Sequence, residues 1–252
     1  MSEPCGAPET AAANRQKLIV ALDVESVGEA RDIIAEIGHT VGAFKIGLQL
    51  FTSAGGSFVR EIIQSGTKVF LDLKFHDIPN TVAKAGIEAA RMGVWMFNVH
   101  ASGGSEMMRR VACDVADLCQ REELTKPNII AVTVLTSSDS NTLREIGTER
   151  EVKDQVLHLA RMASECGLDG VVASANETGL LRESIKSRDF LLVTPGIRPT
   201  FATNDDQRRV MTPGAAISSG ADYLVIGRPV IKAADRLWAV KTILGEMEAA
   251  ST

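Results

Sequence analysis

The sequence predicts an α/β protein folded as a single (β/α)₈ barrel. Short apolar runs rich in strand-forming residues alternate with longer amphipathic stretches, and eight such runs occur along the chain. Strand and helix alternating in this way imply parallel strand pairing, and eight units are the number that a closed parallel barrel needs. An open doubly wound sheet is the alternative. It is disfavoured because the turn after the first strand, residues 23–28, lacks the Gly-x-Gly-x-x-Gly pattern of that fold.

The order of the elements follows from this alternation. Strands are expected over residues 17–24, 43–50, 68–75, 96–101, 128–135, 170–174, 190–194 and 223–226. Helices are expected over residues 27–37, 57–65, 81–92, 105–120, 152–166, 177–187, 213–219 and 233–248. Residues 1–16 carry little apolar content and are expected to form a disordered tail, so that residues 17–252 make up the catalytic barrel domain.

Composition narrows the class of protein further. The chain has 252 residues, of which 45% are hydrophobic, and this is enough to bury the core of one barrel domain. Its net charge of −5 argues against a nucleic-acid or anionic membrane partner, so a small-molecule partner is expected.

The chain shows neither a long apolar run nor a signal-peptide pattern at its start, which predicts a cytoplasmic protein. The four cysteines form no Cys-x-x-Cys pair, so neither a disulfide framework nor a zinc site is predicted.

The stretch from residue 68 to residue 81 contains the most informative pattern. Asp72 and Lys74 stand two positions apart inside an apolar run, and side chains alternate across a strand, so both are expected on one face. An exposed edge strand with a surface ion pair would explain an isolated Asp-x-Lys. The positions of other charged residues favour a functional site instead.

Those other charges fall on the neighbouring strands. Asp23 follows the first apolar run, and Lys45 lies inside the second. In a parallel barrel the active site is built at the carboxyl ends of the strands, so Asp23, Lys45, Asp72 and Lys74 should converge there. Unpaired charges in such a place would cost several kcal/mol each, by estimate, so the four groups should pair with one another or bind a substrate.

The second half of the barrel predicts an anion site. Arg198 follows the seventh strand in Thr-Pro-Gly-Ile-Arg-Pro, and Arg228 follows the eighth in Ile-Gly-Arg-Pro, where barrels often bind phosphate. Glycine lets the backbone approach an anion closely, and arginine holds phosphate oxygens with a planar fork. The polar segment 199–209 between these turns is a candidate lid.

Together these motifs, over about residues 17–243, resemble the orotidine 5′-phosphate decarboxylase family. The matching segments are ALD at 21–23, KIG at 45–47, LDLKFHDIPNT at 71–81, NVHASGG at 98–104, VTVLTS at 132–137, TPGIR at 194–198, DQ at 206–207 and IGR at 226–228. The Asp-x-Lys-x-x-Asp segment alone marks only a superfamily of related barrels. All the motifs in order are specific to this family.

The resemblance implies a decarboxylation without cofactor or metal, carried out by a homodimeric barrel. By that resemblance Lys74 is the proton donor to C6 of the pyrimidine, Asp72 lies near the departing carboxylate, and Lys45 holds the array and contacts the ribose. Asp77 is expected to complete the site of the partner subunit. The remaining substrate contacts implied are Asp23 at a ribose hydroxyl, Ile78 and Thr81 across the dimer, Thr136 at the pyrimidine, Gln207 between base and phosphate, and Arg198, Gly227 and Arg228 at the phosphate.

Two other functions stay open on the residues alone. A magnesium-dependent sugar-phosphate aldolase or decarboxylase would need a further carboxylate beside Asp72, and the second strand offers Lys45 there instead. A non-catalytic phosphate-binding barrel would leave the charged array without a purpose. Spacing alone also does not decide whether Asp77 serves its own site or that of a neighbouring subunit.

Overall fold

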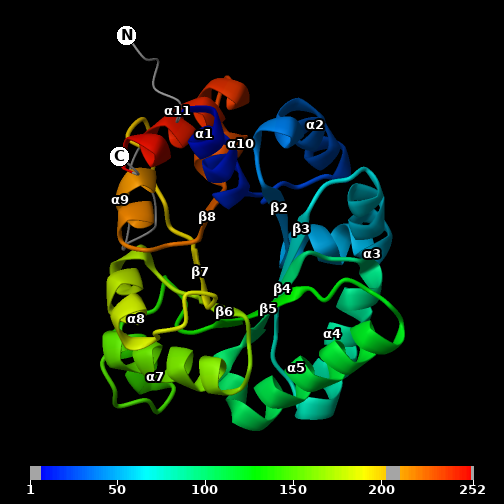
Figure 1. The fold of residues 1–252 in the computed structure, drawn as a ribbon, viewed down its shortest axis with the longest axis vertical. Coiled ribbons are helices and arrows are strands. Elements are labelled where there is room, and N and C mark those ends of the chain that lie inside the picture. The colour runs from blue at the N-terminus through cyan, green and yellow to red at the C-terminus, as the bar shows by residue number, and fades with distance from the viewer. Residues whose placement is uncertain (1–6, 203–210, 251–252) are drawn as a thin grey trace.

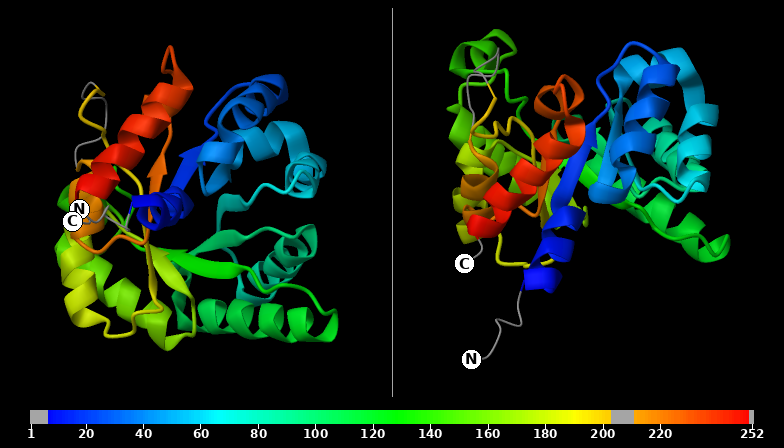
Figure 2. Two further views of the ribbon diagram at one scale, coloured as in Figure 1. Left: turned by 45° about the horizontal axis from the view of Figure 1, so that its top comes forward. Right: turned by 90° about the horizontal axis from the view of Figure 1, so that it is seen from above.

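A computed structural model describes residues 7–202 and 211–250 (Figure 1). Eight parallel strands follow one another around a closed barrel, and β8 pairs with β1 to complete the ring. Helices surround the strands in all three ribbon views (Figures 1 and 2). The predicted (β/α)₈ barrel is therefore confirmed.

Every predicted strand and helix is present, although the first, second and fifth strands end three residues earlier than predicted, and the helices at residues 7–17, 140–145 and 228–231 were not predicted. The strands are β1 (Leu18–Ala21), β2 (Ala43–Gly47), β3 (Val69–Phe75), β4 (Met96–His100), β5 (Asn128–Val132), β6 (Gly170–Val172), β7 (Leu191–Thr194) and β8 (Tyr223–Ile226). The helices are α1 (Ala7–Lys17), α2 (Val27–Ile37), α3 (Leu48–Gln64), α4 (Pro79–Met92), α5 (Gly104–Arg121), α6 (Ser140–Glu145), α7 (Val152–Glu165), α8 (Thr178–Ser184), α9 (Pro213–Ser218), α10 (Arg228–Ile231) and α11 (Arg236–Ala249). Within the described ranges, no helix is both long enough and apolar enough to cross a membrane.

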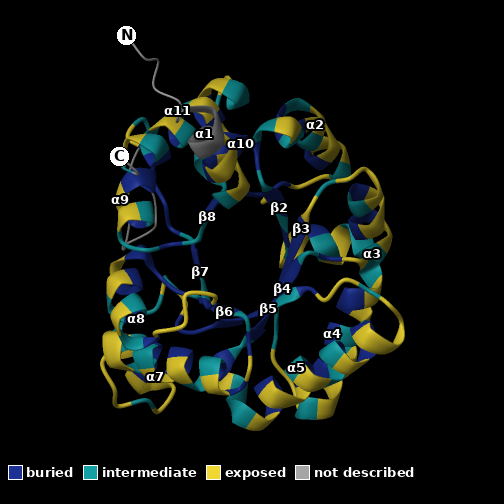
Figure 3. Cartoon of the chain, in the orientation of Figure 1, coloured by how far each residue is buried: buried dark blue, intermediate teal, exposed yellow. Residues whose placement is uncertain are grey.

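Two separate apolar layers hold the barrel together. The interior is filled by one side chain or two from most strands, including Ile19, Phe70, Met96, Ile130 and Val225, all of them buried. A larger cluster fills the space between the outer faces of the strands and the helices. Figure 3 shows the strands buried and the outward faces of the helices exposed. Burial of these two layers is the main favourable term in folding, and it fixes which face of each strand points into the barrel.

Local sequence signals set where several helices begin. Ser26 and Asp235 accept hydrogen bonds from backbone N–H groups in the first turns of α2 and α11, which satisfies donors that the helix itself cannot. Helix α3 is longer than predicted, because it begins directly after β2 and continues through a kink at Gly55, whose φ is +70°. Only a glycine adopts this φ angle without strain. The prediction that the second strand includes residues 48–50 is wrong, because these residues form the first turn of α3.

The N-terminal segment differs from its prediction. Residues 7–16 were expected to be disordered, but residues 7–17 form α1, which contacts α11 and leads directly into β1. Asn14 in this helix is buried. Alanine has the highest helix propensity, and contact with α11 supplies the tertiary support that a short helix needs, so the low apolar content of the segment was a misleading signal. The expected tail residues 1–6 lie outside the described residues.

Two charged clamps tie neighbouring strands together at the amino ends of the strands. Asp169, just before β6, accepts a hydrogen bond from the backbone of β5 and pairs with Lys126 at 2.8 Å. Asp222, just before β8, accepts one from the backbone of β7 and pairs with Arg182. We call these two aspartate-centred pairs the basal clamps. They lie at the end of the barrel opposite the carboxyl ends of the strands.

Candidate active site

Strand β3 brings Asp72 and Lys74 together as the alternation predicted, although its backbone is irregular there. The Nζ atom of Lys74 lies 2.7 Å from Oδ1 of Asp72. Lys74 has a φ of +52°, a left-handed conformation that is uncommon for a residue with a side chain. The pairing of β3 with β4 also shifts between Leu71 and Phe75. The shared face therefore comes from a bulged strand end and not from a regular strand.

Lys45 on β2 links the first three strands. Its Nζ atom lies 3.2 Å from Oδ2 of Asp72 and 3.2 Å from Oδ1 of Asp23, which follows β1. The order Asp23, Lys45, Asp72, Lys74 is therefore a continuous chain of alternating charges, which we call the charged array. Its two ammonium groups and two carboxylates carry equal and opposite charge. Across the described residues, no group of three or more His, Cys, Asp or Glu side chains is placed to hold a metal ion.

Lys45 and Asp72, at the centre of the charged array, keep each other ionised. Burial would raise the pKa of the Asp72 carboxyl, but the charges of Lys45 and Lys74 and the hydrogen bonds from Lys74 and Asn98 outweigh it, and the pKa lies below its usual value. Burial would likewise lower the pKa of the Lys45 ammonium, but Asp72 and Asp23 outweigh it and raise that pKa. The side chains of Lys45 and Asp72 are each 12% exposed, so this pairing takes place largely out of water.

Asn98 is a site residue that the motif-based roles did not include. It lies on β4, is 1% exposed and donates a hydrogen bond from Nδ2 to Oδ1 of Asp72 at 2.7 Å. The backbone N–H of Lys74 donates to Oδ1 of the same asparagine at 2.8 Å. A signal existed in the sequence, since an amide two residues after Met96 falls on the interior face of an apolar strand, where it needs hydrogen-bond partners.

Two adjoining cavities open over the charged array. The first, of about 170 Å³, is lined by Lys45, Asp72 and Lys74 together with Asn98 and apolar side chains of β5 to β8. Thr136, predicted to lie at the pyrimidine, also lines it. The second, of about 210 Å³, is lined by the same three charged residues and by Asp23. The cavities thus share one charged wall, and the first has an opposite wall that is mostly apolar.

Glycines make room for the charged array on two sides. A Cβ atom at Gly47 would lie 3.1 Å from Nζ of Lys45, and one at Gly227 would lie 3.3 Å from Oδ2 of Asp23. Both distances are shorter than ordinary contacts with carbon. Gly227 directly precedes Arg228, so it joins the charged array to the predicted phosphate end of the site.

The two arginines predicted to hold phosphate come together at the ends of β7 and β8. Arg198 and Arg228 line one cavity of about 420 Å³, with Phe201 and Trp238 on its wall. Arg198 is 9% exposed, and its position is fixed by a backbone hydrogen bond from its N–H to the carbonyl of Met211. Among the described residues this cavity shares no lining residue with the two cavities over the charged array. Gly227 precedes Arg228 of this cavity in the chain and lies beside Asp23 of the charged array.

The remaining predicted substrate contacts are not found among the described residues that line these three cavities. Asp77 accepts a hydrogen bond from the backbone N–H of Ile78 at 2.7 Å, and Ile78 is 65% exposed. Neither these two residues nor Thr81 lines the three cavities in the described part of this chain. Gln207 and most of the predicted lid fall within residues 203–210, which lie outside the described residues.

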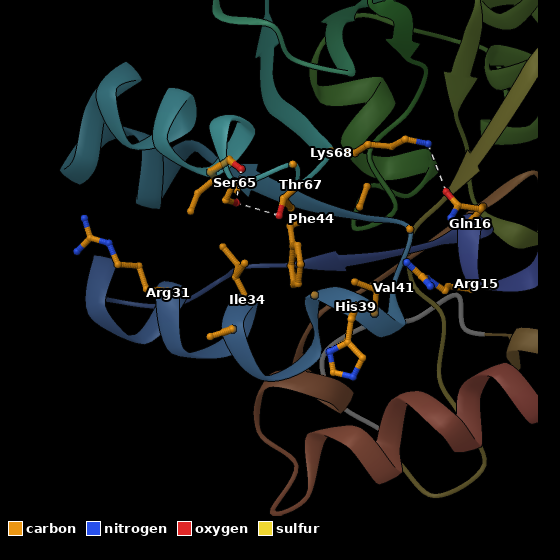
Figure 4. Close-up of a pocket in the computed structure, with 16 residues that line it drawn as sticks. Arg15, Gln16, Arg31, Ile34, His39, Val41, Phe44, Ser65, Thr67 and Lys68 are labelled. Carbon is orange, nitrogen blue, oxygen red and sulfur yellow. Dashed lines mark hydrogen bonds between the residues drawn. The ribbon is translucent and has the colours of Figure 1, made fainter. Parts of the chain in front are cut away.

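A larger cavity, of about 610 Å³, lies at the other end of the barrel (Figure 4). It is lined by the start of β2, by residues just before β2 such as His39, and by residues just before β3 such as Lys68. Lys68 donates a hydrogen bond to Gln16 at 3.3 Å and Arg31 pairs with Glu61 at 2.7 Å, so these two cations already have protein partners. Cavity size alone therefore does not identify the candidate active site. The charged array identifies it at the carboxyl ends of the strands.

Comparison with known proteins finds close relatives of one kind. An orotidine 5′-phosphate decarboxylase of Syntrophotalea carbinolica is 53% identical over 236 residues, covering 94% of this chain and 96% of that protein. One of Geobacter metallireducens is 50% identical over 235 residues, covering 93% and 97%. The crystal structure of orotidine 5′-phosphate decarboxylase from Lactobacillus acidophilus matches with a TM-score of 0.80 at 38% identity, covering 91% of this chain and 98% of that one.

The family match covers nearly the whole barrel. Residues 16–243 match the family described as Orotidine 5'-phosphate decarboxylase / HUMPS family. This span runs from the end of α1 into α11, and so contains every strand, the charged array and both arginines. The chain therefore belongs to the orotidine 5′-phosphate decarboxylase / HUMPS family.

Proposed function

We propose that this carboxy-lyase converts orotidine 5′-phosphate to uridine 5′-phosphate and CO₂ in pyrimidine biosynthesis, and that it does so without a cofactor. The observation that carries the proposal is the charged array, four alternating charges at one barrel mouth. It occurs in a chain that is about half identical to decarboxylases of this name over more than nine-tenths of its length.

The reaction explains why such an array would be needed. When the bond between C6 and the carboxylate breaks, the electron pair stays on C6 in the plane of the ring, where the ring π system does not delocalise it. An ammonium about 4 Å away stabilises a unit negative charge by roughly 4 kcal/mol at an effective dielectric of 20. Very slow reactions need barrier reductions of about 20 kcal/mol or more, so further fixed dipoles and binding energy must contribute.

Lys74 is the proton donor in this proposal. As CO₂ leaves, the ammonium proton of Lys74 passes to C6 and forms the new C–H bond, and the lysine regains a proton from solvent. Its Nζ atom lies 2.7 Å from Oδ1 of Asp72, and an ammonium at this place could both attract the carbanion and protonate it. Asp72 would face the departing carboxylate, and Lys45 would hold Asp72 and reach the ribose.

The remaining contacts would place the nucleotide. Asp23, more exposed than the rest of the charged array, would accept a hydrogen bond from a ribose hydroxyl. Thr136 would contact the pyrimidine in the smaller cavity. Arg198 and Arg228, with the backbone at Gly227, would bind the phosphate, and Gln207 would bridge base and phosphate. Phosphate binding far from C6 would then contribute to the rate by holding the ring against the charged array.

Asp77, Ile78 and Thr81 are proposed to act across a homodimer interface. In support, the carboxylate of Asp77 accepts a hydrogen bond only from the backbone N–H of Ile78 among the contacts found in the described part of this chain, and Ile78 exposes a large apolar side chain to solvent. A partner subunit would cover Ile78 and receive Asp77 beside its own Lys74. Each site would then be completed by the other chain.

The deciding experiment is release of labelled CO₂ from orotidine 5′-phosphate carrying ¹⁴C in its carboxylate, by purified, chelator-treated protein. We expect release by the native chain and a loss of several orders of magnitude in Lys74→Ala. Protein that binds uridine 5′-phosphate but releases no label would instead be a non-catalytic phosphate-ligand barrel. Protein that acts only on a sugar phosphate, and only with magnesium, would belong to the other enzyme class considered above.

A further inference from the structure

Strand β3 loses its regular pairing where the charged array begins. Leu71 pairs with Phe97 and Phe75 pairs with Val99, so four residues are traversed along β3 for two along β4. A bulge of this kind leaves backbone groups without their usual partners, and a buried N–H without a partner is costly. The side chain of Asn98 supplies the partner that the strand does not, because its Oδ1 accepts the N–H of Lys74 at 2.8 Å.

The same side chain also binds the carboxylate. Nδ2 of Asn98 donates to Oδ1 of Asp72 at 2.7 Å, the oxygen that Lys74 Nζ also contacts at 2.7 Å. Asn98 therefore contacts both residues of the Asp-x-Lys pair. Its amide oxygen binds the backbone of Lys74, and its amide NH₂ group binds the carboxylate of Asp72. No other neutral side chain of this size offers an acceptor and a two-proton donor on one rigid plane.

We propose that Asn98 is a positioning residue for the decarboxylation. It holds the backbone of Lys74 in the left-handed conformation and orients the carboxylate of Asp72, so that ammonium and carboxylate face the same reacting carbon. The inference rests on the proposed function for its kinetic consequence. Its structural content, that one amide fixes two charged residues, stands on the contacts alone.

Three variants separate this role from general packing. Asn98→Leu keeps the approximate volume and removes both hydrogen bonds. Asn98→Asp keeps an acceptor for the Lys74 N–H but replaces the donor to Asp72 with a second negative charge. Asn128→Leu is the matched control, since Asn128 is a half-buried asparagine at the amino end of β5 whose Nδ2 donates to the carbonyl of Trp95 at 3.4 Å, away from the mouth.

The kinetic test compares kcat and KM for orotidine 5′-phosphate. We expect kcat to fall about 10- to 100-fold in Asn98→Leu, the equivalent of one lost hydrogen bond to a charged group, with KM changed less than about threefold. Asn98→Asp should lose more than Asn98→Leu, because it places like charges side by side. Asn128→Leu should keep the native kcat. Equal losses in Asn98→Leu and Asn128→Leu would overturn the proposal, because destabilisation alone would then explain both.

A second readout does not depend on the substrate. The groups that face the Asp72 carboxylate are Lys45 from β2, Lys74 from β3 and Asn98 from β4. We expect the Asp72 carboxyl, followed by ¹³C NMR and assigned by its absence in Asp72→Asn, to titrate at higher pH in both Asn98 variants. An unchanged titration together with a kcat within threefold of native would overturn the inference. If the native chain released no CO₂, the proposed function would be wrong. The titration of Asp72 would then be the test of whether Asn98 orients its carboxylate.

Discussion

Lys45 and Asp72 lie on neighbouring strands with Nζ and Oδ2 3.2 Å apart, and each side chain is only 12% exposed. This pair is the buried centre of the charged array. Removing one partner of a largely buried pair leaves the other charge uncompensated, which is costly. The pair therefore links the stability of the barrel to the chemistry at its mouth.

The first prediction concerns that link. Lys45→Met keeps the length of the side chain and removes its charge, so it should lower the free energy of unfolding by about 3 kcal/mol and abolish most activity. Urea unfolding measures the first effect. Lys126→Met is the matched control, because Lys126 forms its 2.8 Å pair with Asp169 at 37% and 29% exposure, and its loss should cost less than about 1 kcal/mol. Equal losses in the two variants would contradict the prediction.

The second prediction is a pH window for the stability that the charged array contributes. The pKa of Asp72 is lowered on folding, so its contribution is present above the unfolded value of about 3.9 and is lost as pH falls through the folded value. The pKa of Lys45 is raised, so its contribution is present below about 10.4 and is lost as pH rises through the folded value. The stability of native protein relative to Asp72→Asn should therefore decline toward acid pH. A difference that stays constant down to pH ~2 would be incompatible with this account.

A third prediction separates the proposed mechanism from a metal-dependent one. Prolonged dialysis against EDTA should leave the rate of CO₂ release unchanged, and added magnesium should not increase it, because the proposed steps use only side chains of the protein. The measurement is kcat before and after chelation. A loss that magnesium restores would favour the metal-dependent alternative.

The fourth prediction tests whether Asp77 works in the partner's site. Lys74→Ala and Asp77→Ala homodimers should each be nearly inactive. After subunit exchange, half of the dimers are hybrids in which one site carries both changes and the other none, so activity should recover to about one quarter of native. Mass spectrometry of differently tagged chains verifies the exchange. Verified exchange without recovery would mean that Asp77 serves its own chain or that the protein is not a dimer.

The fifth prediction concerns the space beside Lys45. Gly47→Ala places a Cβ atom 3.1 Å from Nζ of Lys45 and should displace the ammonium, lowering kcat about 10-fold or more while the fold stays intact. The backbone angles at Gly47 are open to alanine, so strain does not confound the result. Gly245→Ala in α11 meets no neighbouring atom within 4 Å and should keep native activity. Native kcat in Gly47→Ala would show that Lys45 tolerates displacement.

Most of the fold was predictable because its signals are local. The eight apolar runs identify strands, and their spacing identifies the parallel barrel, as β1 to β8 confirm. The differences occur where two signals compete. Residues 48–50 continue the apolar pattern of β2 but belong to α3, and residues 7–17 look like a tail because their support comes from α11, which is distant in sequence.

The site was predictable to a similar degree. Asp23, Lys45, Asp72 and Lys74 meet because strand ends in a parallel barrel meet, which requires no detailed geometry. Strand alternation places Asn98 inside the barrel, but its hydrogen bond to the backbone of Lys74 depends on the bulge and the backbone angles there, which no sequence pattern encodes. The placement of Asp77 depends on a second chain, and it stays a prediction.

The basal clamps have a consequence for engineering. Asp169 and Asp222 each join a strand to its neighbour at the end of the barrel that the nucleotide is not expected to reach. A stabilising substitution made around them would leave the groups that the proposed reaction uses in place. Stability and activity need not be exchanged for one another in this architecture, because the clamps and the charged array lie at opposite ends of the same strands.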